Sequence, residues 1–301
     1  MSAEELEGVG PSSRPGLRTW FSLVRFSHSA FALPFALMGA WLGAGGAPEP
    51  RVLVLVLFSL VAARTAAMAF NRWLDRDIDA ANPRTRGREL PRGALAPGAV
   101  LVSVLLSSGL FVASAFLLNP LAGKLSLPVL LVLLAYSGIK RIHWASHAVL
   151  GLGLALAPLG AWVAVRGDLA GDLRPPLLLA AGVLTWVAGF DLIYACQDAD
   201  FDRRIGLHSV PARFGVPAAL RASSLSHVLT LVLLAAFASV ADLGWVFWTA
   251  LGVAAVLLVW QHAIVSTDDL SRVDLAFFTL NGWVGVGLFL GLVLDGLARR
   301  A

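Results

Sequence analysis

Long apolar runs alternate with short polar stretches along the whole chain, and nine of these runs are long enough to cross a bilayer. A spanning helix needs about 20 mostly apolar residues. Because open sheet edges leave backbone groups unpaired in lipid, all nine runs are predicted to be helices. The predicted spans are 27–47, 50–72, 96–118, 120–139, 146–166, 175–197, 217–240, 243–265 and 275–297.

The composition agrees with lipid as the surrounding medium. Of the 301 residues, 58% are hydrophobic and 14% are charged, whereas soluble domains carry about 25% charged residues. The sequence therefore predicts an all-α integral membrane protein, with residues 17–301 forming a single domain of nine transmembrane helices. Residues 1–16 are polar and rich in Pro, Gly, Ser and Glu, lack the pattern of a secretory signal, and are predicted to be a disordered cytoplasmic tail.

Positive charge is concentrated in alternate connections, above all in 71–92 and 198–213, the two longest hydrophilic stretches. The positive-inside rule then places the N-terminus and both of these stretches in the cytoplasm. Basic loops also suit anionic lipid or nucleic acid. Here they adjoin acidic motifs, which favours a phosphate ligand and no nucleic acid.

The first acidic motif ends the second predicted span, where Asn71, Asp75 and Asp79 follow one another at intervals of four residues. In one helix this spacing places all three on the same face. Like charges four residues apart repel each other, and the cost increases at a membrane boundary. A compensating cation is therefore expected.

A second motif repeats this design at the end of the sixth predicted span and consists of Asp191, Tyr194, Asp198 and Asp202. In one helix its members form one stripe, while Asp77 and Asp200 point away from the two acidic faces and are expected to be solvated. The repetition indicates two related halves that face one site.

Two pairs of carboxylates suit a hard cation. Mg²⁺ takes oxygen ligands, keeps several waters, and bridges one or two carboxylates to substrate phosphates. Histidine and cysteine do not cluster near the motifs, which argues against zinc. Mg²⁺ is therefore the predicted cofactor, and its predicted ligands are Asp75, Asp79, Asp198 and Asp202.

Basic residues near the motifs supply what a diphosphate group also needs. Arg64 lies inside the second span, seven residues before Asn71 and therefore on the same face, and an intramembrane arginine is a functional candidate by default. Guanidinium groups bind phosphate as a planar fork, and lysine acts as a point charge. Near the same cytoplasmic level lie Arg25, Arg72, Lys140 and Arg141, although positive-inside topology explains the last three equally well. His28 and His143 are interpreted as packing or interfacial residues.

The two motifs together resemble the signatures of UbiA-type aromatic prenyltransferases. Residues 71–79 are similar to the first signature and 191–202 to the second, while 82–93 and 206–215 resemble the segments that follow them. Nine spans are also typical of the family, so the resemblance covers nearly the whole chain.

The resemblance implies a helical bundle around a central cavity and a transfer of a polyprenyl group. Diphosphate held through Mg²⁺ leaves the donor, and an electron-rich aromatic ring attacks the allylic carbocation in a site closed to water. By the family's pattern Asp191 orients or partly deprotonates the acceptor phenol, Tyr194 lines the acceptor pocket, and Arg64 and Lys140 contact diphosphate or an acceptor carboxylate. The implied catalytic residues are Asp75, Asp191 and Asp198. The implied substrate-binding residues are Arg25, Arg64, Asn71, Arg72, Lys140 and Tyr194.

Residues 25–36 and 88–91 resemble a bacterial branch that uses 4-hydroxybenzoate, which implies quinone biosynthesis, for ubiquinone or menaquinone, in the inner membrane. Arg72 and Glu89 depart from the more familiar pattern of that branch, so dihydroxynaphthoate, homogentisate, heme and sugar phosphates stay open as acceptors. Two other classes also stay open: a secondary transporter, although transporter sites lie nearer the midplane, and a non-catalytic scaffold.

Overall fold

The computed structural model describes residues 16–23 and 29–300, and within them every regular element is a helix. The predicted disorder of residues 1–16 falls on residues that, apart from Gly16, lie outside this described part. Short helices lie between or beside the long ones along the chain: α1 (Leu17–Leu23), α4 (Arg76–Ala81), η3 (Cys196–Asp198), α9 (Ala199–Ile205), α10 (Val210–Phe214) and the π-helix η4 (Leu275–Leu280). The long helices are α2 (Ser29–Ala44), α3 (Pro50–Leu74), α5 (Pro97–Leu118), α6 (Pro120–Ile139), α7 (Ser146–Arg166), α8 (Arg174–Ala195), α11 (Val216–Val240), α12 (Trp245–Ala263) and α13 (Asn281–Ala298).

Eight segments of the described chain are long and apolar enough to cross a membrane. They correspond to eight of the nine predicted spans, with ends that differ by a few residues outside the acidic motifs. The remaining predicted span, 27–47, is the first along the chain and contains α2. The apolar described part of this helix, Phe31–Ala44, is shorter than a full crossing. The all-helical membrane class is confirmed, and the count of nine spans is not.

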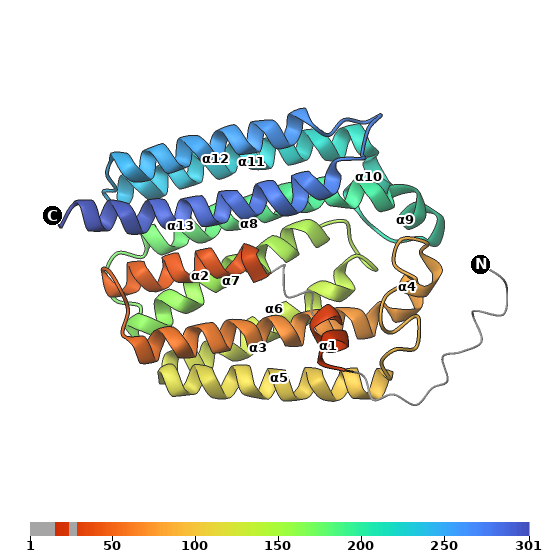
Figure 1. Ribbon diagram of the computed structural model, residues 1–301, viewed down its shortest axis with the longest axis horizontal. Coiled ribbons are helices and arrows are strands. Elements are labelled where there is room, and N and C mark those ends of the chain that lie inside the picture. The colour runs from red at the N-terminus through yellow and green to blue at the C-terminus, as the bar shows by residue number, and fades with distance from the viewer. Residues whose placement is uncertain (1–15, 24–28, 301) are drawn as a thin grey trace.

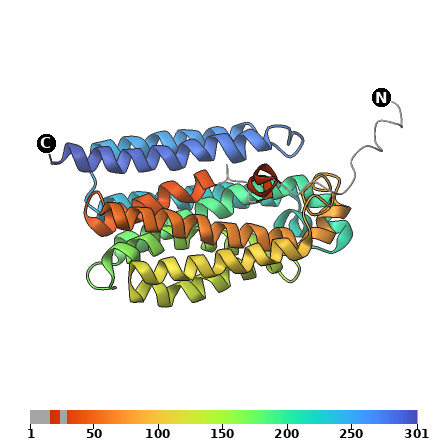
Figure 2. The same cartoon turned by 60° about the horizontal axis from the view of Figure 1, so that its bottom comes forward.

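The long helices lie side by side in a bundle, as both ribbon views show (Figures 1 and 2). Helix α7 packs against α2, α6 and α8, while α3 packs on α5 and α8 packs on α11. Helices α4, α9 and α10 gather at one end, and the chain reaches its C-terminus at the other (Figure 1). This arrangement brings the ends of both acidic motifs to the same end of the bundle.

Glycines allow two of these helix pairs to approach closely. A Cβ atom added at Gly39 in α2 would collide with the backbone carbonyl of Pro158 in α7, and one added at Gly151 in α7 would collide with the carbonyl of Leu184 in α8. Small residues at such crossings let helix backbones pack in lipid, where apolar burial gives little driving force. The crossings hold α7 in the middle of the bundle.

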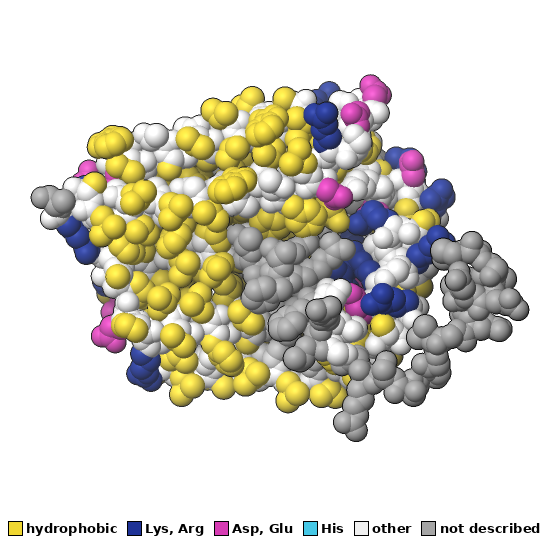
Figure 3. All heavy atoms as spheres, viewed as in Figure 1, with side chains coloured by type: hydrophobic (Ala, Val, Ile, Leu, Met, Phe, Trp, Pro, Cys, Tyr) yellow, Lys and Arg dark blue, Asp and Glu magenta, His cyan; other side chains and the backbone are white. Residues whose placement is uncertain are grey.

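The molecular surface matches a lipid environment. Figure 3 shows hydrophobic side chains over the middle of one face, with charged side chains toward its ends. Large apolar residues are widely exposed, Trp245 at 77% and Leu225 at 71% among them. Soluble proteins rarely expose such extended apolar surfaces. The chain is an integral membrane protein.

Candidate active site

A cavity of about 810 Å³ runs between the central helices. Most of its wall is apolar and comes from α2, α3, α6, α7 and α8. At one end it reaches both acidic motifs, and its lining continues to Leu169 and Leu173 in the connection between α7 and α8. The cavity therefore joins a charged end to a long apolar interior.

The first motif straddles a break between two helices. Helix α3 ends at Leu74, Asp75 adopts φ −89° and ψ 4°, and α4 begins at the next residue. The prediction of one continuous helix is therefore wrong, in keeping with the repulsion of like charges four residues apart. Backbone bonds from Asp75 to Asn71 (2.9 Å) and from Asp79 to Asp75 (2.7 Å) preserve the spacing. All three side chains consequently line the cavity, as the spacing predicts.

The second motif is also divided. Helix α8 carries Asp191 and Tyr194 and ends at Ala195, while Asp198 closes the 3-10 turn η3 and Asp202 lies in α9. The motif therefore does not lie in one continuous helix, and the 3-10 turn changes the rotation per residue within it. All four motif side chains still line the cavity. Asp77 and Asp200 are exposed, as predicted, with side chains 84% and 85% accessible.

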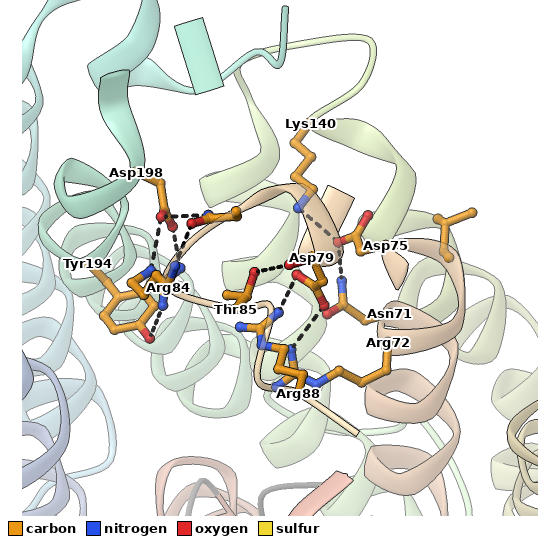
Figure 4. Close-up of polar contacts among 12 residues, drawn as sticks. Asn71, Arg72, Asp75, Asp79, Arg84, Thr85, Arg88, Lys140, Tyr194 and Asp198 are labelled. Atoms are coloured by element: carbon orange, nitrogen blue, oxygen red, sulfur yellow. Dashed lines mark hydrogen bonds and ion pairs between the residues drawn. The ribbon is translucent and has the colours of Figure 1, made fainter. Parts of the chain in front are cut away.

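Cations compensate Asp75, whose side chain is only 2% exposed. Lys140 Nζ lies 2.8 Å from one carboxylate oxygen and Arg141 Nη2 lies 2.9 Å from the other. The Asn71 amide also donates to Asp75, at 3.2 Å (Figure 4). A buried carboxylate is stable only when it is paired in this way, so the expected cationic partners are present.

Asp79 is held by the loop that follows α4. Arg88 Nη1 donates to its Oδ1 at 2.6 Å, and Arg72 Nη1 lies 4.0 Å from its Oδ2 (Figure 4). Oδ2 is buried and has no hydrogen-bond partner in the described ranges. This oxygen therefore keeps an unused capacity to accept a ligand.

Arg84 connects the two motifs across the cavity mouth. Its Nε donates to Asp198 Oδ1 at 2.9 Å, its Nη2 donates to the other oxygen, and its Nη1 donates to the Tyr194 hydroxyl at 2.9 Å (Figure 4). Asn82 donates to Asp198 at 3.1 Å. Burial by itself lowers the pKa of Arg84, but the bonds and charges of Asp198 and Tyr194 outweigh burial and raise that pKa. The loop after the first motif thus supplies the hydrogen-bond donors that hold Asp198 and Tyr194 of the second motif.

The carboxylate oxygens at the cavity mouth fit Mg²⁺ bound together with a diphosphate rather than Mg²⁺ alone. No group of three His, Cys, Asp or Glu side chains in residues 16–23 and 29–300 forms a metal site on its own. Mg²⁺ needs only one or two protein carboxylates when phosphate oxygens and waters supply the remaining ligands. Such carboxylates lie together at one cavity mouth: Asp75, Asp79, Asp198 and Asp202. Oδ2 of Asp79, which lacks a hydrogen-bond partner in the described part of the chain, is suited to bind the metal.

Five of the six predicted substrate-binding residues line the cavity: Arg64, Asn71, Arg72, Lys140 and Tyr194. Arg64 lies deeper than the motifs along α3, where Tyr136 of α6 also faces the cavity. Arg25 lies outside the described residues, as does His28. His143 is exposed, with its ring centroid 4.8 Å from that of Trp144, in keeping with an interfacial role.

The sequence interpretation missed several residues of the site. Arg84 and Arg88 belong to the Arg-rich loop, so their composition was a usable signal. His147 lies 2.7 Å from Asp191 with no sequence signal to reveal the pair. An aromatic group of Phe31, Phe190 and Phe277 lines the cavity beside Tyr194, whose ring centroid is 4.3 Å from that of Phe277. Apolar residues in a membrane span give no sign of such a role.

The fold and site define a helical membrane protein whose apolar cavity opens beside carboxylates that arginine and lysine side chains pair with. The model of the UbiA prenyltransferase family matches residues 32–283. The chain belongs to this family, and with it to the polyprenyltransferase enzymes.

Two curated relatives illustrate the similarity. The chain is 33% identical to the 4-hydroxybenzoate octaprenyltransferase of Nitrosomonas europaea, over 87% of this chain and 88% of the relative. It is 32% identical to the protein of that name from Pseudomonas aeruginosa strain UCBPP-PA14, over 87% of each chain.

Solved structures share the fold. An apo UbiA homolog from Aeropyrum pernix K1 is 37% identical and superposes with a TM-score of 0.80 over 89% of this chain and 98% of that one. A UbiA homolog from Archaeoglobus fulgidus, bound to GPP and Mg²⁺, is 18% identical with a TM-score of 0.67, over 92% and 99% of the two chains. The second likeness concerns the fold alone.

Proposed function

We propose that this protein transfers a polyprenyl group from a polyprenyl diphosphate to an aromatic acid, 4-hydroxybenzoate or a related acceptor, and that it requires Mg²⁺. The observation that carries the proposal is the meeting of two acidic motifs at the mouth of one long apolar cavity. The names of the relatives from Nitrosomonas europaea and Pseudomonas aeruginosa support the acceptor.

The charged end of the cavity binds the donor's diphosphate. Asp75, Asp79, Asp198 and Asp202 would hold Mg²⁺, which would supply stabilisation of the negative charge on the leaving diphosphate. Arginine and lysine side chains neutralise Asp75, Asp79 and Asp198, and the same cations face the phosphate oxygens of the donor. Guanidinium groups suit this role because their planar fork matches phosphate geometry. Four cations both line the cavity and pair with its aspartates: Arg72, Arg84, Arg88 and Lys140.

The apolar interior receives the prenyl tail. Helices α6 and α7 contribute many of the aliphatic side chains that line it, down to the opposite end of the bundle. A long isoprenoid gains about 25 cal/mol for each Å² of apolar surface that leaves water. Binding energy from this remote part of the donor helps to place its first carbon at the reacting end.

The acceptor binds between Asp191, Tyr194 and the deeper Arg64. The bond between the first prenyl carbon and the diphosphate oxygen breaks, and the electron pair leaves with diphosphate. The aromatic rings of Phe31, Phe190 and Phe277 line this region and stabilise the allylic cation through their π faces. A ring carbon of the acceptor then forms the new bond, and the ring loses a proton.

The proposal includes an orientation in the membrane. Most basic residues of the connections lie at the end that carries α4 and α9, which favours a cytoplasmic N-terminus and cytoplasmic motifs. The named relatives are bacterial, so the bacterial inner membrane is the proposed location. The product would serve ubiquinone or menaquinone biosynthesis.

A transporter is the alternative from another class. The paired carboxylates lie at one end of the bundle, and transporter sites lie near the midplane, so the arrangement favours the enzyme. The family alternatives use another acceptor, such as dihydroxynaphthoate, homogentisate, heme or a sugar phosphate, and leave the rest of the proposed reaction unchanged.

The test uses purified protein in lipid with Mg²⁺, a long-chain polyprenyl diphosphate and 4-hydroxybenzoate, and product is detected by mass. Prenylated hydroxybenzoate that disappears with EDTA and with Asp75→Ala is the expected result. If diphosphate were released only with a different aromatic acid, that acid would replace 4-hydroxybenzoate as the proposed acceptor, and the reaction class would stay. No donor turnover with any acceptor would contradict the proposal and favour a transporter or scaffold.

A further inference from the structure

His147 is a buried histidine that no motif includes. It is the second residue of α7, and its exposed fraction is 5%. Its Nδ1 lies 2.7 Å from Oδ2 of Asp191 in α8, and the two helices pack along each other. A polar ring buried at the cavity end, against a cavity-lining carboxylate, requires a hydrogen-bonding reason.

The surroundings of the ring define its tautomer. The backbone N–H of Val210, at the start of α10, points at His147 Nε2 over a long 3.4 Å hydrogen bond. A backbone N–H can only donate, so Nε2 is the acceptor and the ring hydrogen belongs on Nδ1. A carboxylate can only accept, so this Nδ1–H donates to Asp191. Both contacts of the imidazole agree on the same arrangement.

Asp191 is thereby held by one oxygen and left open at the other. Its Oδ2 accepts from His147, while its Oδ1 has no hydrogen-bond partner within the described part of the chain. The side chain is 21% exposed and lines the cavity. An anchored carboxylate with one open oxygen suits the binding of a hydroxyl group that comes from the cavity.

We propose that His147 is a positioning residue, which aims the open oxygen of Asp191 at the phenolic hydroxyl of the aromatic acceptor. This inference rests on the function proposed above. The phenol proton moves to Asp191 Oδ1 as the ring carbon bonds to the prenyl carbon, and a dienone forms. The ring proton then leaves to solvent, the oxygen recovers its proton from Asp191, and the carboxylate is regenerated. His147 keeps its own Nδ1 hydrogen throughout.

The location of His147 explains why Asp191 needs such a partner. Within the described residues, the hydrogen bond of the Asp191 carboxylate comes from His147. Misplacement of a reacting group by about 1 Å can cost about 100-fold in rate. Loss of the His147 donor is therefore expected to lower acceptor turnover by about 10- to 100-fold, with a much smaller effect on donor ionisation.

Two substitutions separate positioning from packing. His147→Leu fills the space and removes the donor, whereas His147→Asn retains an amide that can donate from near the place of Nδ1. The measured quantities are kcat and KM for the acceptor, and the diphosphate released without acceptor. His143→Asn, on the exposed interface, is the matched control.

The expected result is a fall in acceptor kcat in the leucine variant, unchanged diphosphate release without acceptor, and substantial recovery in the asparagine variant. Equal loss of both activities in both variants would mean that His147 only packs the bundle, and unchanged kcat in the leucine variant would also overturn the proposal.

A tautomer measurement decides the matter without turnover. In ¹⁵N-histidine-labelled protein, NMR reports which ring nitrogen of His147 carries hydrogen, and His147→Asn identifies its signals among the six histidines. Hydrogen on Nδ1, with a shift in Asp191→Asn, supports the proposal. Hydrogen on Nε2 overturns it. A wild-type chain without turnover on any acceptor would instead refute the proposed function, and the NMR result would still stand.

Discussion

Replacement of Arg84 by alanine removes the side chain that links the two acidic motifs. Its guanidinium donates to both oxygens of Asp198 and to the Tyr194 hydroxyl. Asn82 would still donate to Asp198, at 3.1 Å. The carboxylate would therefore lose its charged partner while it kept one neutral donor.

The cost follows from how far the pair is exposed to solvent. Loss of one partner from a fully buried ion pair costs about 3–5 kcal/mol, and an exposed pair contributes about 0–1 kcal/mol. The side chains of Arg84 and Asp198 are 31% and 18% exposed, so we expect an intermediate loss of about 2 kcal/mol. For a chain of this size the melting temperature should fall by about 4 °C.

Mg²⁺ provides a second and sharper readout. Without donor, Mg²⁺ should raise the melting temperature of Arg84→Ala more than that of the wild type, because the ion no longer competes with a guanidinium for Asp198. With donor present, KM for the polyprenyl diphosphate should rise about 10-fold, since a charge-assisted hydrogen bond contributes about 1.5 kcal/mol or more.

Thermal melts with and without Mg²⁺ and steady-state kinetics would test both expectations. The control is Arg86→Ala, which removes an exposed arginine from the same loop. If Arg84→Ala matched Arg86→Ala in melting temperature, in its response to Mg²⁺ and in donor KM, the bridge between the motifs would have no energetic role and the reasoning would be refuted.

Three further predictions concern other parts of the molecule. Asp79→Asn should lower kcat by about 100-fold or more, because it weakens charge stabilisation at the leaving diphosphate; Mg²⁺-dependent product formation measures this, and near-normal kcat would exclude Asp79 as a metal ligand. Arg64→Leu should raise acceptor KM by about 10- to 100-fold if its guanidinium binds the acceptor carboxylate, whereas a rise in donor KM alone would assign it to diphosphate. Gly39→Val should destabilise the bundle by about 1–3 kcal/mol, since its Cβ collides with the Pro158 carbonyl, and an unchanged melting temperature would show that α2 can shift without cost.

The apolar runs alone were enough to locate the membrane helices, because each span must satisfy its backbone bonds within itself. Eight predicted spans reappear with nearly the same ends, apart from the irregular turns at the acidic motifs. The motifs were equally accessible to sequence reasoning. Their spacing is local, and it survives in the structure although helices break at Asp75 and after Ala195.

Those breaks mark the limit of local reasoning. Spacing predicts a shared face only while the helix type stays constant, and the 3-10 turn at Cys196–Asp198 changes the rotation per residue. The sequence offers no means to tell where charge repulsion and the end of the lipid phase will interrupt a helix. The structure shows that the interruptions leave all the motif carboxylates at the cavity.

The partners of those carboxylates were decided by tertiary packing. Arg84 and Asp198 are separated by 114 positions, and His147 and Asp191 by 44. Residues so far apart in the sequence meet only through packing, and close crossings such as that of α7 and α8 at Gly151 contribute to it. The sequence by itself determined which residues carry charge inside an apolar chain, since that is a property of each residue and its near neighbours. Which charges meet, and across which cavity, depends on helix packing between distant segments, and only the tertiary structure decided it.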